Sequence, residues 1–346
     1  MSVIFVTGAS GLIGSHILLE LLQQGHTVRA LTRNSNKAIV FFSRLLKHYH
    51  LDEKLSEGIT WIEGDLRDVA RYDEYLHSIE TVFHCAGFVS TASSDRKKMY
   101  EVNVRCTADL VDYCLNTSVK WFGHMSSVAS LGPNPEGLVD EDYFWKQDKN
   151  HSNYALSKYL SEQEVWRAKE EGLAVQIFNP AVVIGPSGEN GNLHKLYNRL
   201  KRGIAFYPKG SSGFIDVRDL ASFCVLQWTK KVTGSRVIVS AENLSQKVFL
   251  QNVCAALNVS PPRYPLSKTV FKIGSATEFF LRFGQSKKCL LQNDLFKMGS
   301  SKNRFDNQKS LRMGAQYRPV EEAIENSVQF SVTTTNTSQL NVGTST

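Results

Sequence analysis

The sequence predicts an α/β protein with a doubly wound parallel sheet and a smaller α+β domain toward the C-terminus. Strand-like and helix-like segments alternate strictly from residue 2 to residue 178. The strand-like segments are nearly continuous apolar runs, which is typical of parallel strands that are buried on both faces. The first of them leads directly into a glycine-rich turn and a helix, as at the start of a Rossmann-type sheet.

The composition is that of a globular protein. The chain has 346 residues, of which 42% are hydrophobic, so it can bury the core of one large or two modest units. Its formal charge of +7 is spread along the chain without a run of five or six basic residues, so no nucleic-acid partner is predicted. No apolar run approaches the length of a membrane span, and no signal peptide precedes the first strand. We therefore expect a soluble, cytoplasmic protein.

The cysteines are widely spaced, and none forms a C-x-x-C pair. Two of them fall in segments that are expected to be buried. Reduced thiols in the core are the preferred interpretation, and no metal site is predicted. The six are Cys85, Cys106, Cys114, Cys224, Cys254 and Cys289.

The apolar run 3–6 is followed by Thr7-Gly8-Ala9-Ser10-Gly11-Leu12-Ile13-Gly14, which opens an apolar-periodic stretch that reaches residue 22. A strand, a glycine turn and a helix in this order bring bare backbone N–H groups and a helix N-terminus to an anion. Gly8 permits the tight turn, Gly11 lets the backbone approach a pyrophosphate, and Gly14 lets the helix lie close to the strand. We therefore expect a dinucleotide at this turn. The predicted contacts are Gly8, Ser10, Gly11, Leu12, Ile13 and Gly14.

Residues 27–32 form the second predicted strand, and its end bears on the choice of cofactor. An acidic residue there would bond the adenosine ribose hydroxyls, whereas a basic one would accommodate a 2′-phosphate. The chain has Arg33 at this point, followed by Asn34, Ser35 and Lys37, and no acid. NADP is therefore favoured over NAD, with Arg33 as the contact; the alternative is a solvated polar loop.

Residues 38–57 are predicted to form a helix, and residues 59–63 the third strand. Asp65 follows that strand, where its carboxylate can accept a hydrogen bond from an adenine amino group or simply cap the next helix. The fourth strand, 81–87, ends in small residues that leave room for a ligand. A helix over about 96–115 carries Asn103, whose side chain is expected to have a partner.

The fifth strand, 121–125, ends at Ser126 and Ser127, and a long helix over about 154–171 follows. Tyr154 and Lys158 lie one turn apart on one face of that helix. A neighbouring ammonium group stabilises a phenolate, so the hydroxyl becomes able to exchange a proton near neutral pH. A serine hydroxyl beside it can hold a carbonyl or alcohol oxygen. Taken alone, a Tyr-x-x-x-Lys spacing also occurs by chance on helix surfaces.

The sixth strand, 174–178, completes a predicted Rossmann domain over 1–178, to which 214–240 is expected to return. The substrate domain is predicted to comprise 179–213 and 241–330. Within it, 267–300 is amphipathic and is interpreted as a surface helix, with contact to a membrane surface as the alternative. Residues 331–346 are rich in Ser, Thr and Asn and are predicted to be disordered.

The order of these signals resembles the extended short-chain dehydrogenase/reductase superfamily, in particular its NAD-dependent epimerase/dehydratase group, over about residues 2–330. The resemblance implies that Tyr154 is the general acid or base, that Lys158 bonds the nicotinamide ribose, and that Ser127 holds the substrate oxygen. The motifs that carry it are Thr7-Gly8-x-x-Gly11-x-x-Gly14, Asp65-Leu66, His84-x-Ala86-Gly87, Val102-Asn103-Val104-x-x-Thr107, Ser126-Ser127, Tyr154-x-x-x-Lys158, Asn179-Pro180 with Gly185-Pro186, and Phe214-Ile215-Asp216-Val217-x-Asp219.

The resemblance also assigns the residues around the cofactor. It implies that Asp65 and Leu66 flank the adenine and that Asn103 steadies the site. The backbone from Pro180 to Val183 would meet the carboxamide. The residues expected to line the cofactor after the fourth strand are Cys85, Ala86 and Gly87. The chain departs from its relatives at Cys106, where many have glycine, and at Arg218, where many have aspartate; neither position belongs to the catalytic set.

Two reactions fit this resemblance. A carbonyl reductase or alcohol dehydrogenase, similar to the dihydroflavonol-reductase and 3β-hydroxysteroid-dehydrogenase branches, would transfer hydride between nicotinamide and a carbonyl or secondary alcohol. A nucleotide-sugar epimerase or dehydratase would hold NAD tightly and would need a cationic grip on a diphosphate. Asn179 could contribute to that grip together with four basic residues, whose alternative role is a solvated helix face. They are Lys195, Arg199, Lys201 and Arg202.

The NADP-preferring reductase is the favoured prediction. A sensor that binds the dinucleotide without catalysis is a third reading, although such proteins typically lose the tyrosine or the lysine, and both are present. The substrate pocket is expected between Ser127, Tyr154, Ser90, Thr91 and residues 181–215. A homodimer through helices 96–115 and 154–171 would be usual for such proteins.

Overall fold

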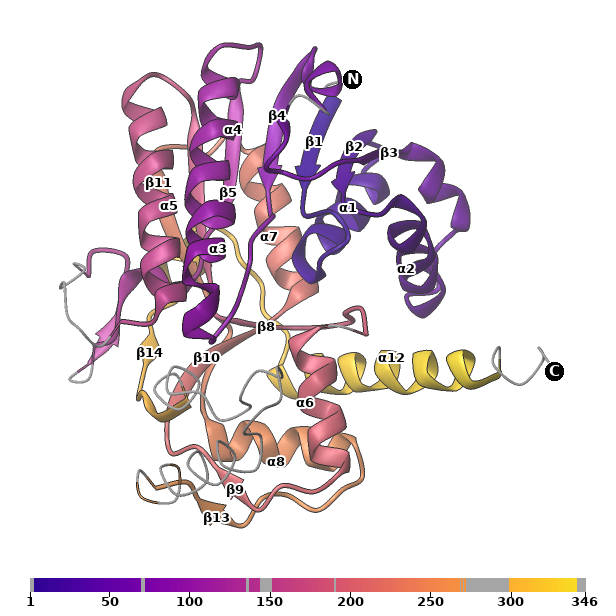
Figure 1. The fold of residues 1–346 in the computed structure, drawn as a ribbon, viewed down its shortest axis with the longest axis vertical. Coiled ribbons are helices and arrows are strands. Elements are labelled where there is room, and N and C mark those ends of the chain that lie inside the picture. Colours follow the sequence, from indigo (N-terminus) through magenta and orange to yellow (C-terminus); the bar gives the residue numbers. More distant parts are fainter. Residues whose placement is uncertain are drawn as a thin grey trace.

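A seven-stranded parallel sheet forms the centre of the protein (Figure 1), which confirms the predicted doubly wound α/β fold. The computed structural model describes residues 3–69, 72–134, 137–143, 151–189, 191–267, 269, 271 and 299–340. The strand order is β11-β7-β5-β4-β1-β2-β3, and every neighbouring pair is parallel. The strands are β1 (Val3–Thr7), β2 (Val28–Thr32), β3 (Ile59–Glu63), β4 (Ile79–His84), β5 (Trp121–Met125), β7 (Val175–Pro180) and β11 (Ser235–Val239).

Helices cover both faces of this sheet. Successive residues of β1 point to opposite sides, so Ile4 and Val6 belong to one hydrophobic core and Phe5 to the other. The first core is closed by α1 (Leu12–Gln23), α2 (Ser35–His48) and α7 (Val217–Thr229). The second is closed by α4 (Cys106–Leu115) and α5 (Asn153–Glu170). Burial on both faces explains why the strand sequences are apolar throughout rather than alternating.

The helical segment 96–115 contains a π-helical turn that the sequence did not reveal. Between α3 (Arg96–Tyr100) and α4, residues Glu101–Arg105 form the wider turn η5. Such turns often occur at functional positions, because they insert one residue into the regular helical spacing. Here the turn carries Asn103, whose side chain is buried.

The remaining elements form a smaller α+β part below the central sheet (Figure 1). A second sheet has the order β12-β10-β8. Its strands are β8 (Val182–Ile184), β10 (Ser211–Asp216) and β12 (Glu242–Ser245). Residues 211–216 therefore lie in this second sheet, whereas α7 and β11 return to the central one. Two short strand pairs join β9 (Phe206–Tyr207) to β13 (Tyr264–Pro265) and β14 (Arg304–Phe305) to β6 (Leu138–Val139).

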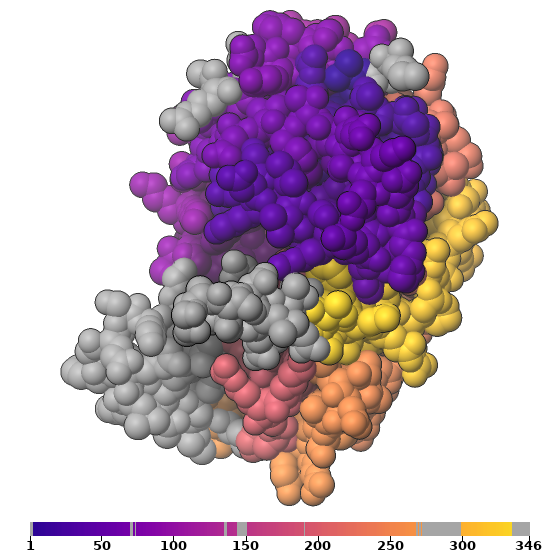
Figure 2. Space-filling view, turned by 90° about the vertical axis from the view of Figure 1, so that its right-hand side faces the viewer, coloured from indigo at the N-terminus to yellow at the C-terminus, as the bar shows by residue number. Residues whose placement is uncertain are grey.

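The smaller part has its own core, to which three helices contribute. They are α6 (Asn192–Lys201), α8 (Gln246–Ala256) and α12 (Val320–Leu340). A further short helix, α11 (Gln308–Arg312), lies against β11. Figure 2 shows α12, in yellow, along the boundary between the N-terminal residues, in indigo and purple, and the smaller part, in red and orange.

The prediction of disorder from residue 331 onward is wrong for residues 331–340, because α12 continues to Leu340. Ser331 is buried, and its hydroxyl is hydrogen-bonded to Nδ1 of His194 at 3.0 Å. Phe330, one residue earlier, packs edge-on against Phe41 and His48 of α2. Composition alone predicted a tail with little to bury, but Phe330 and Ser331 hold the helix against the domain at the point where that tail was expected to begin.

The helix predicted over 38–57 is also shorter than expected. α2 ends at His48, His50 adopts a left-handed backbone with φ 54°, and a separate 3-10 turn, η1, spans Glu53–Gly58. The side chain of Asp52 caps this turn by accepting a hydrogen bond from the Lys54 N–H at 2.9 Å. The left-handed residue and the new cap together explain why the helix stops.

Several other expectations concern the rest of the chain. Most of the amphipathic segment 267–300 lies outside the described residues, as do Cys289 and residues 341–346. The five cysteines in the described part of the chain are free thiols. None of the helices described here combines the length and apolar character that a membrane crossing requires.

Candidate active site

The glycine turn between β1 and α1 has three glycines with different constraints. Gly8 has φ +64°, and a Cβ there would lie 2.7 Å from the backbone N of Ala86. A Cβ on Gly14 would lie 2.3 Å from the carbonyl oxygen of Gly8. A Cβ on Gly11 would meet only that same oxygen, at 3.1 Å. Packing within the protein therefore requires Gly8 and Gly14, whereas Gly11 is exposed and leaves its backbone open to a ligand.

This turn fits a dinucleotide phosphate. Gly11 is the N-cap of α1, and no side chain caps the first turn of that helix. The backbone N–H groups there are thus available to an anion. Ser10 is exposed beside them, and its Oγ accepts a hydrogen bond from Thr32 Oγ1 at 3.1 Å, which leaves the serine hydrogen free to be donated.

A buried chain of hydrogen bonds connects the glycine turn after β1 to the π-helical turn η5. The Ala86 N–H donates to Thr7 Oγ1, which lies 2.8 Å from Nδ1 of His84. Nε2 of His84 lies 3.0 Å from Thr107 Oγ1, whose hydroxyl donates to the Asn103 carbonyl at 2.7 Å. Burial lowers the pKa of His84 to about 3, so the ring is neutral. A neutral ring donates a hydrogen bond from one nitrogen and accepts one at the other. The sequence motifs include His84 and Thr107 but do not reveal this connection.

Asn103 holds the loop after β4 against α5. Its Oδ1 accepts a hydrogen bond from the Phe88 N–H at 2.7 Å, and its Nδ2 donates to the Phe88 carbonyl at 3.0 Å and to Ser157 Oγ at 2.9 Å. A Cβ on Gly87 would lie 3.4 Å from Nζ of Lys158 and 3.6 Å from Oδ1 of Asn103. The structure therefore brings the 85–87 segment, Asn103 and Lys158 together at the carboxyl end of β4.

Lys158 is 5% exposed, and its Nζ donates a hydrogen bond to the Met125 carbonyl at 2.8 Å. Burial lowers the pKa of Lys158 to about 8, against the opposing effect of the negative charge of Glu162. The ammonium therefore remains largely protonated at neutral pH. Burial likewise raises the pKa of Cys85 to about 12, so its thiol is uncharged.

Tyr154 and Ser127 are brought together, since their side chains share a hydrogen bond. Ser127 follows β5 and caps a short 3-10 turn, η6 (Val128–Leu131), through the Ala129 N–H. Burial raises the pKa of Tyr154 above its ordinary value, and the hydrogen bond to Ser127 offsets part of that rise. This direction is opposite to the one expected from the Tyr154–Lys158 spacing, because loss of solvent outweighs any stabilisation of the phenolate.

At the other end of the candidate cofactor site, the carboxylate of Asp65 is bound by Arg67. Arg67 donates from Nε at 2.9 Å and from Nη2 at 2.8 Å. These hydrogen bonds are the main reason that the pKa of Asp65 falls to about 2, and the nearby charge of Arg33 adds to the effect. Arg33 is exposed, whereas Leu66 is buried in the core. Arg67 is a residue of this region that sequence reasoning missed.

The residues suggested for a diphosphate grip are not brought together. Asn179 is fully buried, and its Nδ2 donates to the Ser127 carbonyl at 3.1 Å and to Glu162 at 2.6 Å. The four basic residues at 195–202 are exposed on and just after α6. Of the predicted carboxamide contacts, Pro180 ends β7 and Val183 lies in β8. Ser90, which was expected in the substrate pocket, donates a hydrogen bond to the Asp95 carboxylate at 2.6 Å.

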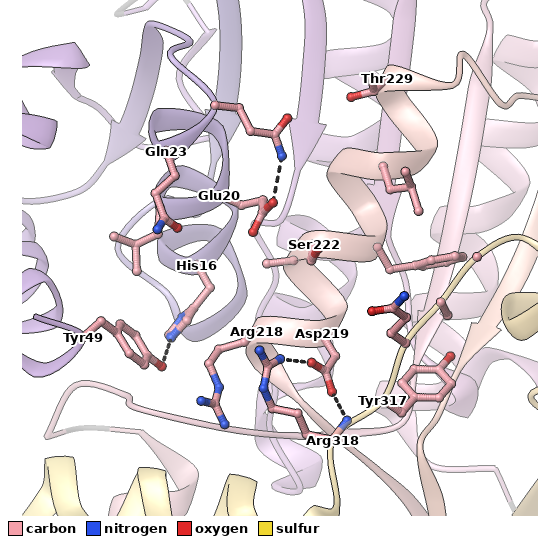
Figure 3. A pocket seen from close by; sticks show the side chains of 18 of the residues that line it. His16, Glu20, Gln23, Tyr49, Arg218, Asp219, Ser222, Thr229, Tyr317 and Arg318 are labelled. Atoms are coloured by element: carbon pink, nitrogen blue, oxygen red, sulfur yellow. Dashed lines mark hydrogen bonds and ion pairs between the residues drawn. The ribbon is translucent and has the colours of Figure 1, made fainter. Parts of the chain in front are cut away.

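A cavity of about 820 Å³ lies elsewhere, between α1, α7 and residues 314–318 (Figure 3). Its lining includes Arg218, which forms an ion pair with Asp216 at 2.6 Å, and Arg318, which pairs with Asp219. His16 Nε2 is 2.9 Å from the Tyr49 hydroxyl. None of the described residues that line this cavity belongs to the predicted site, so the cavity is separate from the residues discussed above.

Comparisons with known proteins identify a matching family model and similar sequences. The model of the NAD dependent epimerase/dehydratase family matches residues 4–239. A putative dihydroflavonol 4-reductase of Synechocystis sp. is 30% identical over 268 residues, which cover 75% of this chain and 74% of that protein. Cinnamoyl-CoA reductase 1 of Petunia hybrida is 27% identical over 340 residues, or 94% of this chain and 91% of that protein.

Solved structures support the fold. The crystal structure of gox2253 has a TM-score of 0.77 at 23% identity and covers 96% of this chain and 99% of that one. A UDP-glucuronic acid 4-epimerase from Bacillus cereus, solved with UDP-glucuronic acid and NAD, has a TM-score of 0.73 at 18% identity, with the same coverage. At these identities the likeness concerns the fold alone.

The different constraints on the glycines predict different effects of adding a methyl group. Gly14→Ala should lower the free energy of unfolding in chemical denaturation, because its Cβ collides with the Gly8 carbonyl. Gly11→Ala should fold almost normally but weaken NAD(P)H binding, followed by fluorescence titration, by about tenfold or more. Equal destabilisation of the two variants, or wild-type affinity in Gly11→Ala, would contradict these assignments.

Proposed function

Since the chain belongs to the NAD-dependent epimerase/dehydratase family, we propose that it is an NADP-preferring reductase that acts on the carbonyl group of an aldehyde or ketone. The observation that carries the proposal is the hydrogen-bonded pair of Ser127 and Tyr154 hydroxyls, with the buried ammonium of Lys158 one helical turn from Tyr154. These are an oxygen-binding group, a proton donor and a cation.

The proposed roles follow from these positions. The bound nicotinamide would supply the hydride that reduces the carbonyl carbon. Ser127 donates a hydrogen bond to the carbonyl oxygen as negative charge develops there. Tyr154 then gives its proton to that oxygen, and its raised pKa keeps it protonated until this step. The charge of Lys158 stabilises the phenolate that remains, and a proton from solvent restores the hydroxyl.

The described residues also suit the parts of the dinucleotide. The turn from Gly8 to Gly14, with Ser10, Leu12 and Ile13 inside it, would hold the pyrophosphate at the N-terminus of α1. Cys85, Ala86 and Gly87 would border the nicotinamide ribose next to Lys158, and the backbone from Pro180 to Val183 would meet the carboxamide. Asp65 and Leu66 would flank the adenine.

Three features favour reduction over epimerisation of a nucleotide sugar. Asn179 is engaged in a buried network instead of facing a diphosphate. The exposed Arg33 at the end of β2 suits a 2′-phosphate, and a cofactor that never exchanges gains little from such selectivity. Relatives that span most of the chain are named as reductases. The retained Tyr154 and Lys158 argue against a sensor without catalysis.

The role of Tyr154 is tested by removing its hydroxyl. Tyr154→Phe should lower kcat for NADPH-dependent carbonyl reduction by about 10²–10⁴-fold, the usual contribution of a general acid, while the Kd for NADPH changes little. Tyr159→Phe, on the same helix, serves as the control and should retain activity. A parallel loss of NADPH affinity in Tyr154→Phe would mean that the hydroxyl is structural.

The choice of cofactor is tested at Arg33. Arg33→Ala should weaken NADPH binding by about tenfold or more and leave NADH binding nearly unchanged, because only NADPH carries the 2′-phosphate. Calorimetric titration with each cofactor measures the ratio of the Kd for NADH to the Kd for NADPH. Arg44→Ala removes the same charge from α2 and should affect neither. If Arg33→Ala weakened both cofactors equally, Arg33 would not be the selective contact.

A further inference from the structure

Glu162 is a fully buried carboxylate on α5, one helical turn beyond Lys158. Its position places Tyr154, Lys158 and Glu162 four residues apart, along the same face of the helix. Burying a carboxylate is costly unless other groups pair with it or donate hydrogen bonds to it. In the proposed mechanism this carboxylate neither binds the substrate oxygen nor transfers a proton.

Donors from two neighbouring strand ends converge on one oxygen of Glu162. Oε1 accepts hydrogen bonds from Ser126 Oγ, from Ser130 Oγ at 2.5 Å and from Asn179 Nδ2 at 2.6 Å. Ser126 and Ser130 follow β5, and Asn179 lies in β7. Three donors on one carboxylate oxygen replace the water that it loses on burial and fix α5 relative to both strand ends.

The same donors also reach the backbone of Ser127. Asn179 Nδ2 lies 3.1 Å from the Ser127 carbonyl oxygen, and Ser130 Oγ lies 2.7 Å from it. Asn179 has two amide hydrogens and can donate to Glu162 and to this carbonyl together, whereas the single hydroxyl hydrogen of Ser130 goes to one of the two. Since the Ser127 side chain is hydrogen-bonded to Tyr154, the placement of the oxygen-binding hydroxyl depends on this network.

The second oxygen of Glu162 faces a cation. Oε2 lies 3.6 Å from Nη1 of Arg236 in β11, and in the described part of the chain it has no hydrogen-bond partner. Arg236 also donates to the carbonyl of Glu141, at 2.8 Å from Nε. The carboxylate therefore lies between two cations, Lys158 on its own helix and Arg236 on the sheet edge.

The other titratable groups around Lys158 are uncharged at neutral pH. His84 on β4 and His124 on β5 are buried, and burial lowers the pKa of both rings well below the ordinary value. Cys85 and Tyr154 remain protonated because burial raises the pKa of each. Glu162 is thus the group whose negative charge supports the ammonium of Lys158.

We propose that Glu162 is a positioning residue for the reduction. Its carboxylate fixes the Ser127 backbone through the two amide hydrogens of Asn179, and its charge holds the ammonium of Lys158 in place. The role in fixing Ser127 rests on the proposed function. The role in stabilising Lys158 does not, because that stabilisation affects cofactor binding whatever the substrate is.

The test compares Glu162→Gln with Glu164→Gln, which removes the same charge from the outer side of α5, where Glu164 pairs with Arg167. The Kd for NADPH is measured by fluorescence from about pH 6 to about pH 10. The pH-dependent change in Kd that is absent from Lys158→Met is the one caused by titration of Lys158. In wild type this change is expected as pH rises through about 8, where the ammonium loses its proton. In Glu162→Gln it should move to lower pH by about one unit or more, and in Glu164→Gln it should not move.

The effect on Ser127 is read from turnover. Glu162→Gln should lower kcat by up to about 10²-fold, the loss that a small misplacement of a reacting group can cause. Ser130→Ala keeps the charge of Glu162 but removes a hydroxyl that can donate either to Glu162 or to the Ser127 carbonyl, so it should lower kcat without moving the pH at which NADPH affinity changes. Ser130→Ala also tests the network if Glu162→Gln fails to fold.

The outcomes separate the two proposals. An unchanged pH dependence of NADPH binding together with an unchanged kcat in Glu162→Gln would overturn the role of Glu162 and leave the proposed reductase intact. If wild type reduces no aldehyde or ketone, yet Glu162→Gln shifts the binding profile, the reductase proposal fails while the support of Lys158 stands.

Discussion

The buried ammonium of Lys158 is the charge on which the arrangement of the candidate site depends. A cation with 5% exposure is costly unless carbonyl or carboxylate oxygens replace the lost water. Here the Met125 carbonyl accepts its hydrogen bond, and Glu162 supplies a negative charge one turn along α5. Because Met125 ends β5 and the Glu162 carboxylate is bonded to groups after β5 and in β7, satisfying this cation also fixes the helix against the carboxyl ends of those strands.

Contacts of α12 join the two parts of the protein. α12 packs in the core of the smaller part, yet Phe330 on the same helix contacts Phe41 and His48 of α2. His48 also lies 2.7 Å, through Nε2, from the Asn326 side chain. Near the start of α12, Arg318 pairs with Asp219 of α7. The smaller part therefore docks on the helices of the central sheet through apolar, polar and charged contacts, and substrate groups bound there would be held in a defined place relative to Tyr154.

Features encoded locally were predictable from the sequence. Apolar runs gave the strands of the sheet, and the spacing of Tyr154 and Lys158 placed both on one helix face. Long-range partners were not predictable: the bonding of Glu162 needs β5 and β7 side by side, and Phe330 and Ser331 of α12 contact α2 and His194. The π-helical turn at Asn103 changes the helical spacing without a compositional signal. The sign of the pKa shift of Tyr154 depends on burial, which a four-residue spacing does not reveal.

The proposed reduction requires a cofactor that exchanges between turnovers. The most direct measurement is to identify and quantify the dinucleotide that accompanies the purified protein, before and after dialysis, and then to follow NADPH oxidation with a panel of aldehydes and ketones. We expect substoichiometric, dialysable cofactor and net oxidation of NADPH in preference to NADH. Stoichiometric NAD that survives dialysis, with no net oxidation of added NADPH, would contradict this expectation and indicate a reaction in which hydride returns to the substrate.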